Sequence, residues 1–178
     1  MKRDKDRGQH TQELTIAGLT AALYTGLTLI SQTFGLASGA IQFRLSEALM
    51  ILPAFTWAAV PGLAAGCVLS NLLTGCALWD VVFGSLATLM GAYGTFFLSG
   101  SMKKLKPADT EWGIGEWMVL IVSPVLSNMA VIPVILKTVY GAEGGYWYFL
   151  FTVGIGEAVC CGVLGILLGR ALKRTGIF

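Results

Sequence analysis

The stretch IQFRLSEALMILP, residues 41–53, decides how the fold is interpreted, because it places an arginine and a glutamate inside a long apolar region. Arg44 and Glu47 are three residues apart, so on an α-helix they would share one face and could pair. Residues 14–43 and 48–79 on either side carry no charge. Either Glu47 only neutralises Arg44, or the two side chains line a binding pocket.

The composition is that of a membrane protein. Of the 178 residues, 55% are hydrophobic and 12% are charged, whereas soluble domains usually carry about 25% charged residues. We therefore expect an all-α integral membrane protein that crosses the cell (plasma) membrane several times. The apolar run at residues 14–42 is too long for the core of a signal peptide, so we expect it to be retained as the first helix.

Hydrophobic length predicts six transmembrane helices, because a bilayer core of about 30 Å needs roughly 20 helical residues. We place the spans at residues 14–33, 41–56, from 62 to about 75, 79–101, 116–137 and 146–170. The chain then divides into an N-terminal tail at 1–13, a transmembrane domain at 14–170 with a polar loop at about 102–115, and a C-terminal tail at 171–178.

Basic residues gather at three places: residues 2–7, residues 103–106 and residues 170–174. Cytoplasmic flanks of membrane spans are rich in lysine and arginine. An even number of spans puts all three clusters on one side, so both tails and the polar loop are predicted to be cytoplasmic.

Four ionisable residues lie within or at the edge of the spans: Arg44, Glu47, Asp80 and Glu157. A charge at the bilayer centre costs about 2.5–3.5 kcal/mol on insertion scales, so such residues face a cavity or a partner. The helix rise puts Glu47 roughly 9 Å and Glu157 roughly 15 Å below the outer edge. We therefore predict a pocket open to the outside, with these candidate substrate-binding residues: Arg44, Glu47, Asn71, Trp79, Asp80, Asn128, Trp147 and Glu157.

Several classes of activity find no support in the sequence. No GxxxxGK[ST] motif is present, so the chain binds no ATP through a P-loop. The single histidine, His10, lies in the predicted tail, which excludes a serine–histidine dyad or a histidine-ligated metal within the membrane. We expect no enzyme activity, metal or cofactor in this chain.

Three stretches of the sequence resemble the substrate-binding (S) subunits of energy-coupling-factor (ECF) transporters. They are the quoted stretch, the following PAFTWAAVPGLAAGCVLSNLLTG, and WDVVFGSLATL. Among these the chain most resembles the queuosine-precursor transporter (QueT) family, from about residue 14 to 170. The resemblance implies a six-helix bundle with an outer pocket, partnered by a transmembrane coupling protein and two cytoplasmic ATPases. It also implies an AxxxA coupling contact on the first helix, matched here by Ala17 and Ala21.

The substrate implied by the resemblance is a deazaguanine base with a cationic aminomethyl arm, which Glu47, Asp80 and Glu157 are candidates to bind. These observations favour the substrate-binding subunit of an ATP-driven importer that delivers a queuosine precursor inward. Two alternatives remain open: a stand-alone ion-coupled carrier that uses Glu157, and a membrane assembly or scaffold protein in which the buried charges are structural.

Overall fold

The computed structural model describes residues 2–36, 42–105 and 111–175, and within these ranges the protein is helical without a strand. This confirms the all-α prediction. In chain order the elements are α1 (Lys2–Thr33), the 3₁₀-helix η1 (Leu45–Ala54), α2 (Ala59–Leu73), α3 (Leu78–Leu105), α4 (Ile114–Thr138), α5 (Tyr146–Glu157), the π-helical turns η2 (Ala158–Leu164) and α6 (Gly165–Thr175).

Four helical stretches in the described ranges are long and apolar enough to cross a membrane: Arg7–Thr33, Leu78–Leu105, Ile114–Thr138 and Tyr146–Thr175. They correspond to the predicted first, fourth, fifth and sixth spans. The last one is a single helical rod made of α5, η2 and α6. Helix α1 also continues back to Lys2, through most of the segment predicted as a tail. The other two elements are shorter, with 10 residues in η1 and 15 in α2.

The predicted second span is a 3₁₀-helix preceded by extended chain. Arg44 has φ −96° and ψ 103° and lies before the first turn, where its carbonyl oxygen accepts the N–H of Glu47 at 3.0 Å. The prediction that Arg44 and Glu47 share one α-helical face is therefore wrong. Two local features favour the observed shape: Ser31 Oγ accepts the N–H of Leu45 at 2.9 Å, and Pro53 lacks an N–H near the helix end.

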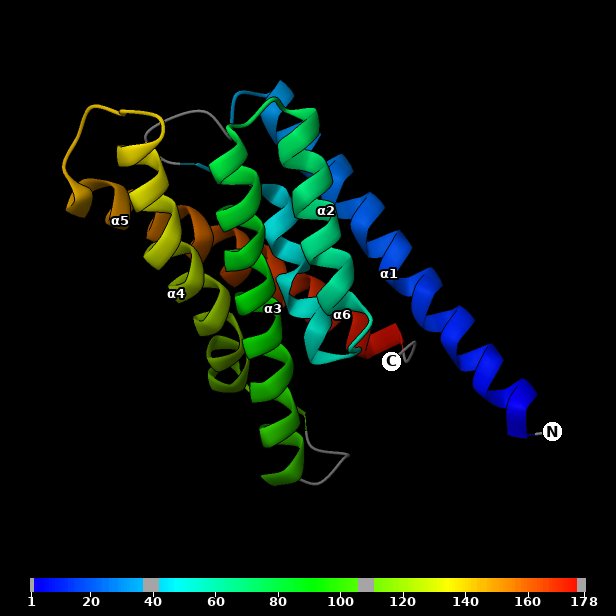
Figure 1. The fold of residues 1–178 in the computed structure, drawn as a ribbon. Helices are drawn as coiled ribbons and strands as arrows, with labels where there is room; N and C mark the ends of the chain where they lie inside the picture. The colour runs from blue at the N-terminus through cyan, green and yellow to red at the C-terminus, as the bar shows by residue number, and fades with distance from the viewer. Residues whose placement is uncertain (1, 37–41, 106–110, 176–178) are drawn as a thin grey trace.

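Helix η1 forms the centre of the bundle. It contacts α1, α2, α3, α4, η2 and α6, and Figure 1 shows it as the cyan segment enclosed by the other helices. Eight of its ten residues are buried: Ser46, Glu47, Ala48, Leu49, Met50, Ile51, Pro53 and Ala54. A short apolar segment of this kind is typical of a buried core helix, and the surrounding protein shields its irregular backbone from lipid.

Small residues bring α1 and α2 close together. A Cβ atom added to Gly62 would lie 2.6 Å from the carbonyl oxygen of Ala17, and one added to Gly66 would lie 2.9 Å from that of Ala21. Such close approach is how transmembrane helices associate where lipid removes the hydrophobic driving force. Ala17 and Ala21, predicted as a coupling contact, thus pack inside this chain, while Gly18 and Ala22 on the adjacent face are exposed.

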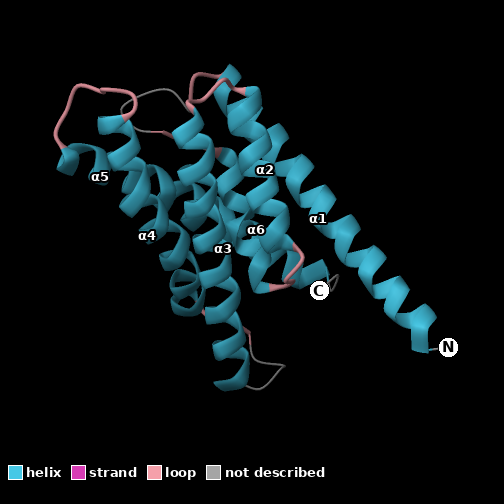
Figure 2. Cartoon of the chain, in the orientation of Figure 1, coloured by secondary structure: helices cyan, strands magenta, loops and turns pink. Residues whose placement is uncertain are grey.

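The two ends of the bundle differ in charge. At the upper end in Figures 1 and 2, the end of α1, the α2–α3 turn and the α4–α5 loop come together. At the lower end lie the end of α3, the start of α4 and the end of α6. The last turns of α3 and α6 are basic, with Lys103, Lys104, Lys173 and Arg174. The polar cavities described next belong to the upper half.

Candidate functional site

Two adjoining cavities, which share three lining residues, lie between α1, η1, α2, α3, α4 and α5. The narrow cavity has a volume of about 10 Å³ and is lined by Gln42, Arg44, Glu47, Gly84, Thr88, Asn128, Ile132, Val153 and Glu157. The wide cavity has a volume of about 260 Å³ and is lined by Thr28, Gln32, Gln42, Arg44, Asn71, Thr74, Gly75, Cys76, Asp80, Ile132, Ile135, Leu136 and Tyr140. Gln42, Arg44 and Ile132 line both cavities and so form their shared wall.

The narrow cavity brings two carboxylates from distant parts of the chain together. Glu47 comes from η1 and Glu157 from the end of α5, and one oxygen of each lies within 4.8 Å of the other and of Cys161 Sγ. Glu157 Oε1 accepts the N–H of Asn128 at 2.8 Å, and its Oε2 accepts the S–H of Cys161 at 3.3 Å. Both oxygens of Glu157 are therefore hydrogen-bonded.

Glu47 is only half satisfied. Its Oε1 accepts the hydroxyl of Tyr24, but its Oε2 is buried and has no hydrogen-bond partner in the described structure. The Glu47 side chain is 2% exposed, so bulk solvent does not reach its carboxylate. Leaving a buried acceptor unpaired costs about 1–3 kcal/mol, and more for a charged group. Glu47 Oε2 is therefore a hydrogen-bond acceptor without a donor at the wall of the narrow, water-sized cavity.

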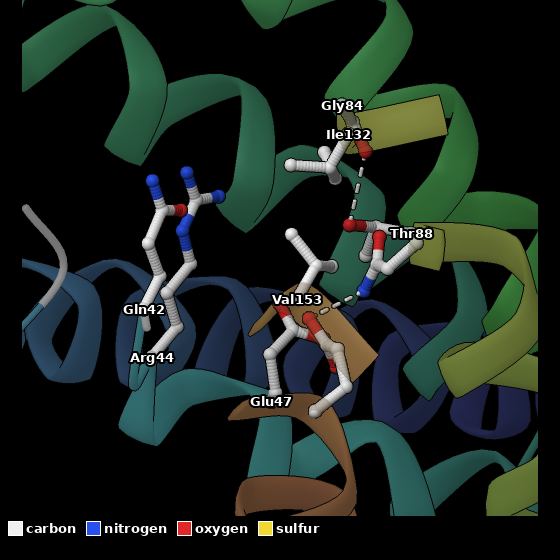
Figure 3. A pocket seen from close by; sticks show the side chains of 9 residues that line it. Gln42, Arg44, Glu47, Gly84, Thr88, Ile132 and Val153 are labelled. Carbon is white, nitrogen blue, oxygen red and sulfur yellow. Dashed lines mark hydrogen bonds between the residues drawn. The ribbon is translucent and has the colours of Figure 1, made fainter. Parts of the chain in front are cut away.

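Arg44 does not pair with the carboxylate of Glu47. Figure 3 shows Arg44 and Gln42 extending side by side, apart from Glu47. Among the residues that the structure describes, no basic nitrogen lies within 4 Å of the carboxylate of Glu47 or Glu157. Glu47 consequently lacks the ion pair with Arg44 that was one of the two alternatives from the sequence. In a buried space, two neighbouring carboxylates favour a bound cation or a shared proton.

A polar stripe on α1 holds Glu47 in place. Tyr24, Thr28 and Ser31 follow one another at spacings of four and three residues, and all three are buried. Tyr24 donates to Glu47, Thr28 donates to Ser46 at 2.8 Å, and Ser31 accepts from Leu45. Sequence reasoning missed Tyr24, although the helical spacing of these hydroxyl residues could have revealed a buried polar face.

Helix geometry around Glu157 positions the second acid. Glu157 ends α5 and is followed by η2, in which Cys161 bonds both to Glu157 and to the carbonyl oxygen of Glu47 at 3.4 Å. Insertions of π-helix often occur at functional sites because they reorient side chains. Gly156 contributes as well, because a Cβ atom there would collide with the carbonyl oxygen of Gln42. The missing side chain lets the extended chain before η1 lie against α5.

The wide cavity contains one acid that is already paired. Asp80, in the first turn of α3, accepts the hydroxyl of Tyr140 at 2.9 Å, and the same hydroxyl accepts the N–H of Ala77 at 3.1 Å. Asn71 donates to the backbone carbonyl of Asp80 at 3.4 Å. Desolvation and, less strongly, the negative charge of Asp80 raise the pKa of the Tyr140 phenol, while the Ala77 N–H lowers it. Tyr140 therefore keeps its proton and ties the α4–α5 loop to the start of α3.

Six of the eight predicted site residues line these cavities: Arg44, Glu47, Asn71, Asp80, Asn128 and Glu157. Two do not. Trp79 is 61% exposed and stacks on Phe83, and Trp147 is 70% exposed and packs edge-on against Tyr146. Both lie on the outer surface of their helices, where tryptophans anchor a protein at the membrane interface.

Comparison with known proteins identifies the family of this chain. The family model described as QueT transporter matches residues 14–174, nearly the whole chain. The chain is 34% identical over 91 residues to "Queuosine precursor transporter QueT" from Lactococcus lactis subsp. cremoris (strain MG1363), a match covering 51% of this chain and 50% of that protein. No solved structure matches. The extent of the family match shows that the chain belongs to the QueT transporter family, and it is a multi-pass membrane protein.

Proposed function

We propose that this member of the QueT transporter family is the substrate-binding subunit of an ECF-type importer. It would capture a queuosine precursor, a deazaguanine base, from outside and deliver it inward with a partner ATPase module. The observation that carries this proposal is the pair of adjoining cavities, which combines a wide space with a narrow acidic end. The relative named for queuosine precursor transport supports the choice of substrate.

The cavities suggest how such a ligand would lie. The flat base would occupy the wide cavity, where the carboxylate of Asp80 can accept two N–H groups from a guanine-type edge. The ammonium of the aminomethyl arm would enter the narrow cavity, which has the size of a single water molecule. There Glu47 Oε2 and the carboxylate of Glu157 would accept its hydrogen bonds. Arg44, on the shared wall, would donate to the carbonyl oxygen of the base.

We also propose six membrane crossings with both termini in the cytoplasm. At about 2.0 Å per residue η1 is about 20 Å long, and at about 1.5 Å per residue α2 is about 22 Å long. Each therefore covers most of a hydrocarbon core of about 30 Å. The basic lower end would face the cytoplasm, and the wide cavity would then lie on the outer side.

The partners would be a transmembrane coupling protein and two cytoplasmic ATPase subunits, which would use the ATP because this chain contains no P-loop motif. Ala17 and Ala21 remain the predicted coupling contact, although they pack against α2. Gly18 and Ala22 offer an exposed pair with the same spacing. Gly18→Leu would show whether that face is needed for assembly. Gly100→Leu in α3 is the control, because an added Cβ atom there, as at Gly18, meets no atom within 4 Å.

A thermal-shift or native mass-spectrometry screen of the purified chain against deazaguanines and common vitamins tests the proposed substrate. We expect a deazaguanine to stabilise the chain and the vitamins to have no effect.

Uptake assays in vesicles test the partner requirement. Transport by this chain alone would contradict the ECF assignment and favour an ion-coupled carrier. Absence of any ligand, together with unfolding of the Glu157→Gln variant, would favour a scaffold.

A further inference from the structure

A cavity at the lower end of the bundle takes no part in the proposed transport site. This basic cleft has a volume of about 300 Å³ and is lined by Glu111, Trp112, Trp117, Arg170, Lys173 and Arg174. Its walls are the segment just before α4, the first turn of α4 and the last turns of α6. Three of the six lining side chains are cationic and one is anionic, so the cleft attracts an anion.

The three cations come from one face of α6. Arg170 precedes Lys173 by three residues and Arg174 by four, which brings their side chains together on a helix. Their position at a helix C-terminus complements the macrodipole, but like charges at this spacing repel one another. An anion held between Arg170 and Arg174, both exposed, would relieve that repulsion, and the planar arginine head binds phosphate through two parallel hydrogen bonds.

The opposite wall of the cleft is aromatic and rigid. Trp117 is 1% exposed and packs against Gly169 of α6, while Trp112 stacks edge-on against Trp117 with ring centroids 5.0 Å apart. Lys173 Nζ lies 5.1 Å from the centre of the Trp112 ring. Tryptophans are enriched at the depth of lipid headgroups, where one side of the ring is apolar and the other is wet.

The surface beside the cleft changes from apolar to basic along the same helix face. Leu167 is 59% exposed and lies one turn before Arg170, which is followed one turn later by Arg174. On α4, Ile114 and Met118 are likewise exposed, at 63% and 51%. Acyl chains would contact these apolar side chains, so a phosphate attached to them would reach the cleft from the membrane side.

We propose that the basic cleft binds the phosphate headgroup of an anionic membrane phospholipid. Basic pockets between transmembrane helices on the cytoplasmic side are known to bind anionic headgroups, and each lysine or arginine near the surface contributes about fivefold in affinity. The adjoining lipid-facing apolar surface favours a lipid over a free anion as the source of the phosphate. This inference does not depend on the transported substrate.

The test is native mass spectrometry of the full purified chain, titrated with phosphatidylglycerol or with phosphatidylcholine. We expect one phosphatidylglycerol per chain to be retained with at least tenfold preference over phosphatidylcholine. Arg170→Gln and Arg174→Gln should each weaken this retention about fivefold. Lys104→Gln, which removes the same charge from an exposed site at the end of α3, is the matched control and should change it less than twofold.

Three results would overturn the proposal. Equal retention of the two lipids would show that the headgroup charge is not recognised. Equal effects of Lys104→Gln and Arg170→Gln would mean that the overall charge, rather than the cleft, attracts the lipid. Displacement of phosphatidylglycerol by millimolar inorganic phosphate would identify a free-anion site instead. Thermal unfolding of each variant serves as the folding check, because both arginines are exposed and their loss should leave the midpoint unchanged.

Discussion

The narrow and wide cavities contain carboxylates in opposite states. In the wide cavity Asp80 already accepts the hydroxyl of Tyr140, whereas in the narrow cavity Glu47 Oε2 is buried without a partner beside Glu157. A carboxylate that already accepts a hydrogen bond stabilises the empty protein, and a ligand that binds it must share that carboxylate with the existing donor. An unsatisfied acid destabilises the empty protein and gains its partner only on binding. The comparison therefore predicts that these acids differ in their effects on stability and affinity.

The largest effect should come from the narrow cavity. Glu47→Gln or Glu157→Gln should weaken binding of an aminomethyl deazaguanine about 100-fold, because each removes a buried charge from the proposed ammonium site. The thermal midpoint of the empty Glu47→Gln variant should stay the same or rise, since Glu47 Oε2 has no partner to lose. That of Glu157→Gln should not rise, because both oxygens of Glu157 already accept hydrogen bonds. Calorimetric titration measures the binding affinity, and thermal unfolding measures the midpoint. Unfolding of both variants would indicate that these acids are structural.

A smaller effect should come from the wide cavity. Asp80→Asn should weaken binding about tenfold, because an amide accepts only one of the two hydrogen bonds expected from the base edge. Unlike Glu47→Gln, it should not raise the thermal midpoint, since Asp80 already has a partner in Tyr140. If Asp80→Asn weakened binding 100-fold and raised the thermal midpoint, Asp80 would behave like Glu47, and the proposed difference between the two cavities would be wrong.

Tyr24→Phe tests whether the orientation of Glu47 matters. The substitution keeps the ring and deletes only the hydroxyl that donates to Glu47 Oε1. We expect about fivefold weaker binding, consistent with loss of about 1 kcal/mol from one hydrogen bond. Thr25→Val on the same helix, where the hydroxyl bonds only to backbone carbonyls, is the control and should leave affinity unchanged.

The smallest effect is expected at the tryptophans outside both cavities. Trp79→Phe and Trp147→Phe should change ligand affinity less than twofold, because both rings lie exposed on the outer helix surfaces. If either substitution weakened ligand binding tenfold or more in the same titration, that tryptophan ring would contact the ligand. The binding site would then extend beyond the two cavities.

The long helices could be predicted because length and hydropathy alone identify a membrane span, as in Ile114–Thr138. The shape of η1 could not, because it depends on contacts with six other elements and on the extended backbone at Arg44. The cavity acids were predictable since an ionisable residue within the membrane requires a partner or ligand. The spacing of Tyr24, Thr28 and Ser31 could indicate a buried polar face, but not which acid it meets. The pairings of Glu47 with Tyr24 and of Asp80 with Tyr140 span 23 and 60 residues along the chain, so they could not be predicted.

The central claim is that Glu47 and Glu157 bind a ligand ammonium in the narrow cavity. Calorimetry with the purified wild-type chain tests it most directly, using aminomethyl deazaguanine and the otherwise identical methyl deazaguanine. We predict that loss of the amine weakens binding by at least about 30-fold in the wild type and has little effect in the Glu157→Gln variant. Equal affinity of the wild-type chain for the two compounds would contradict the claim, even if both bind tightly.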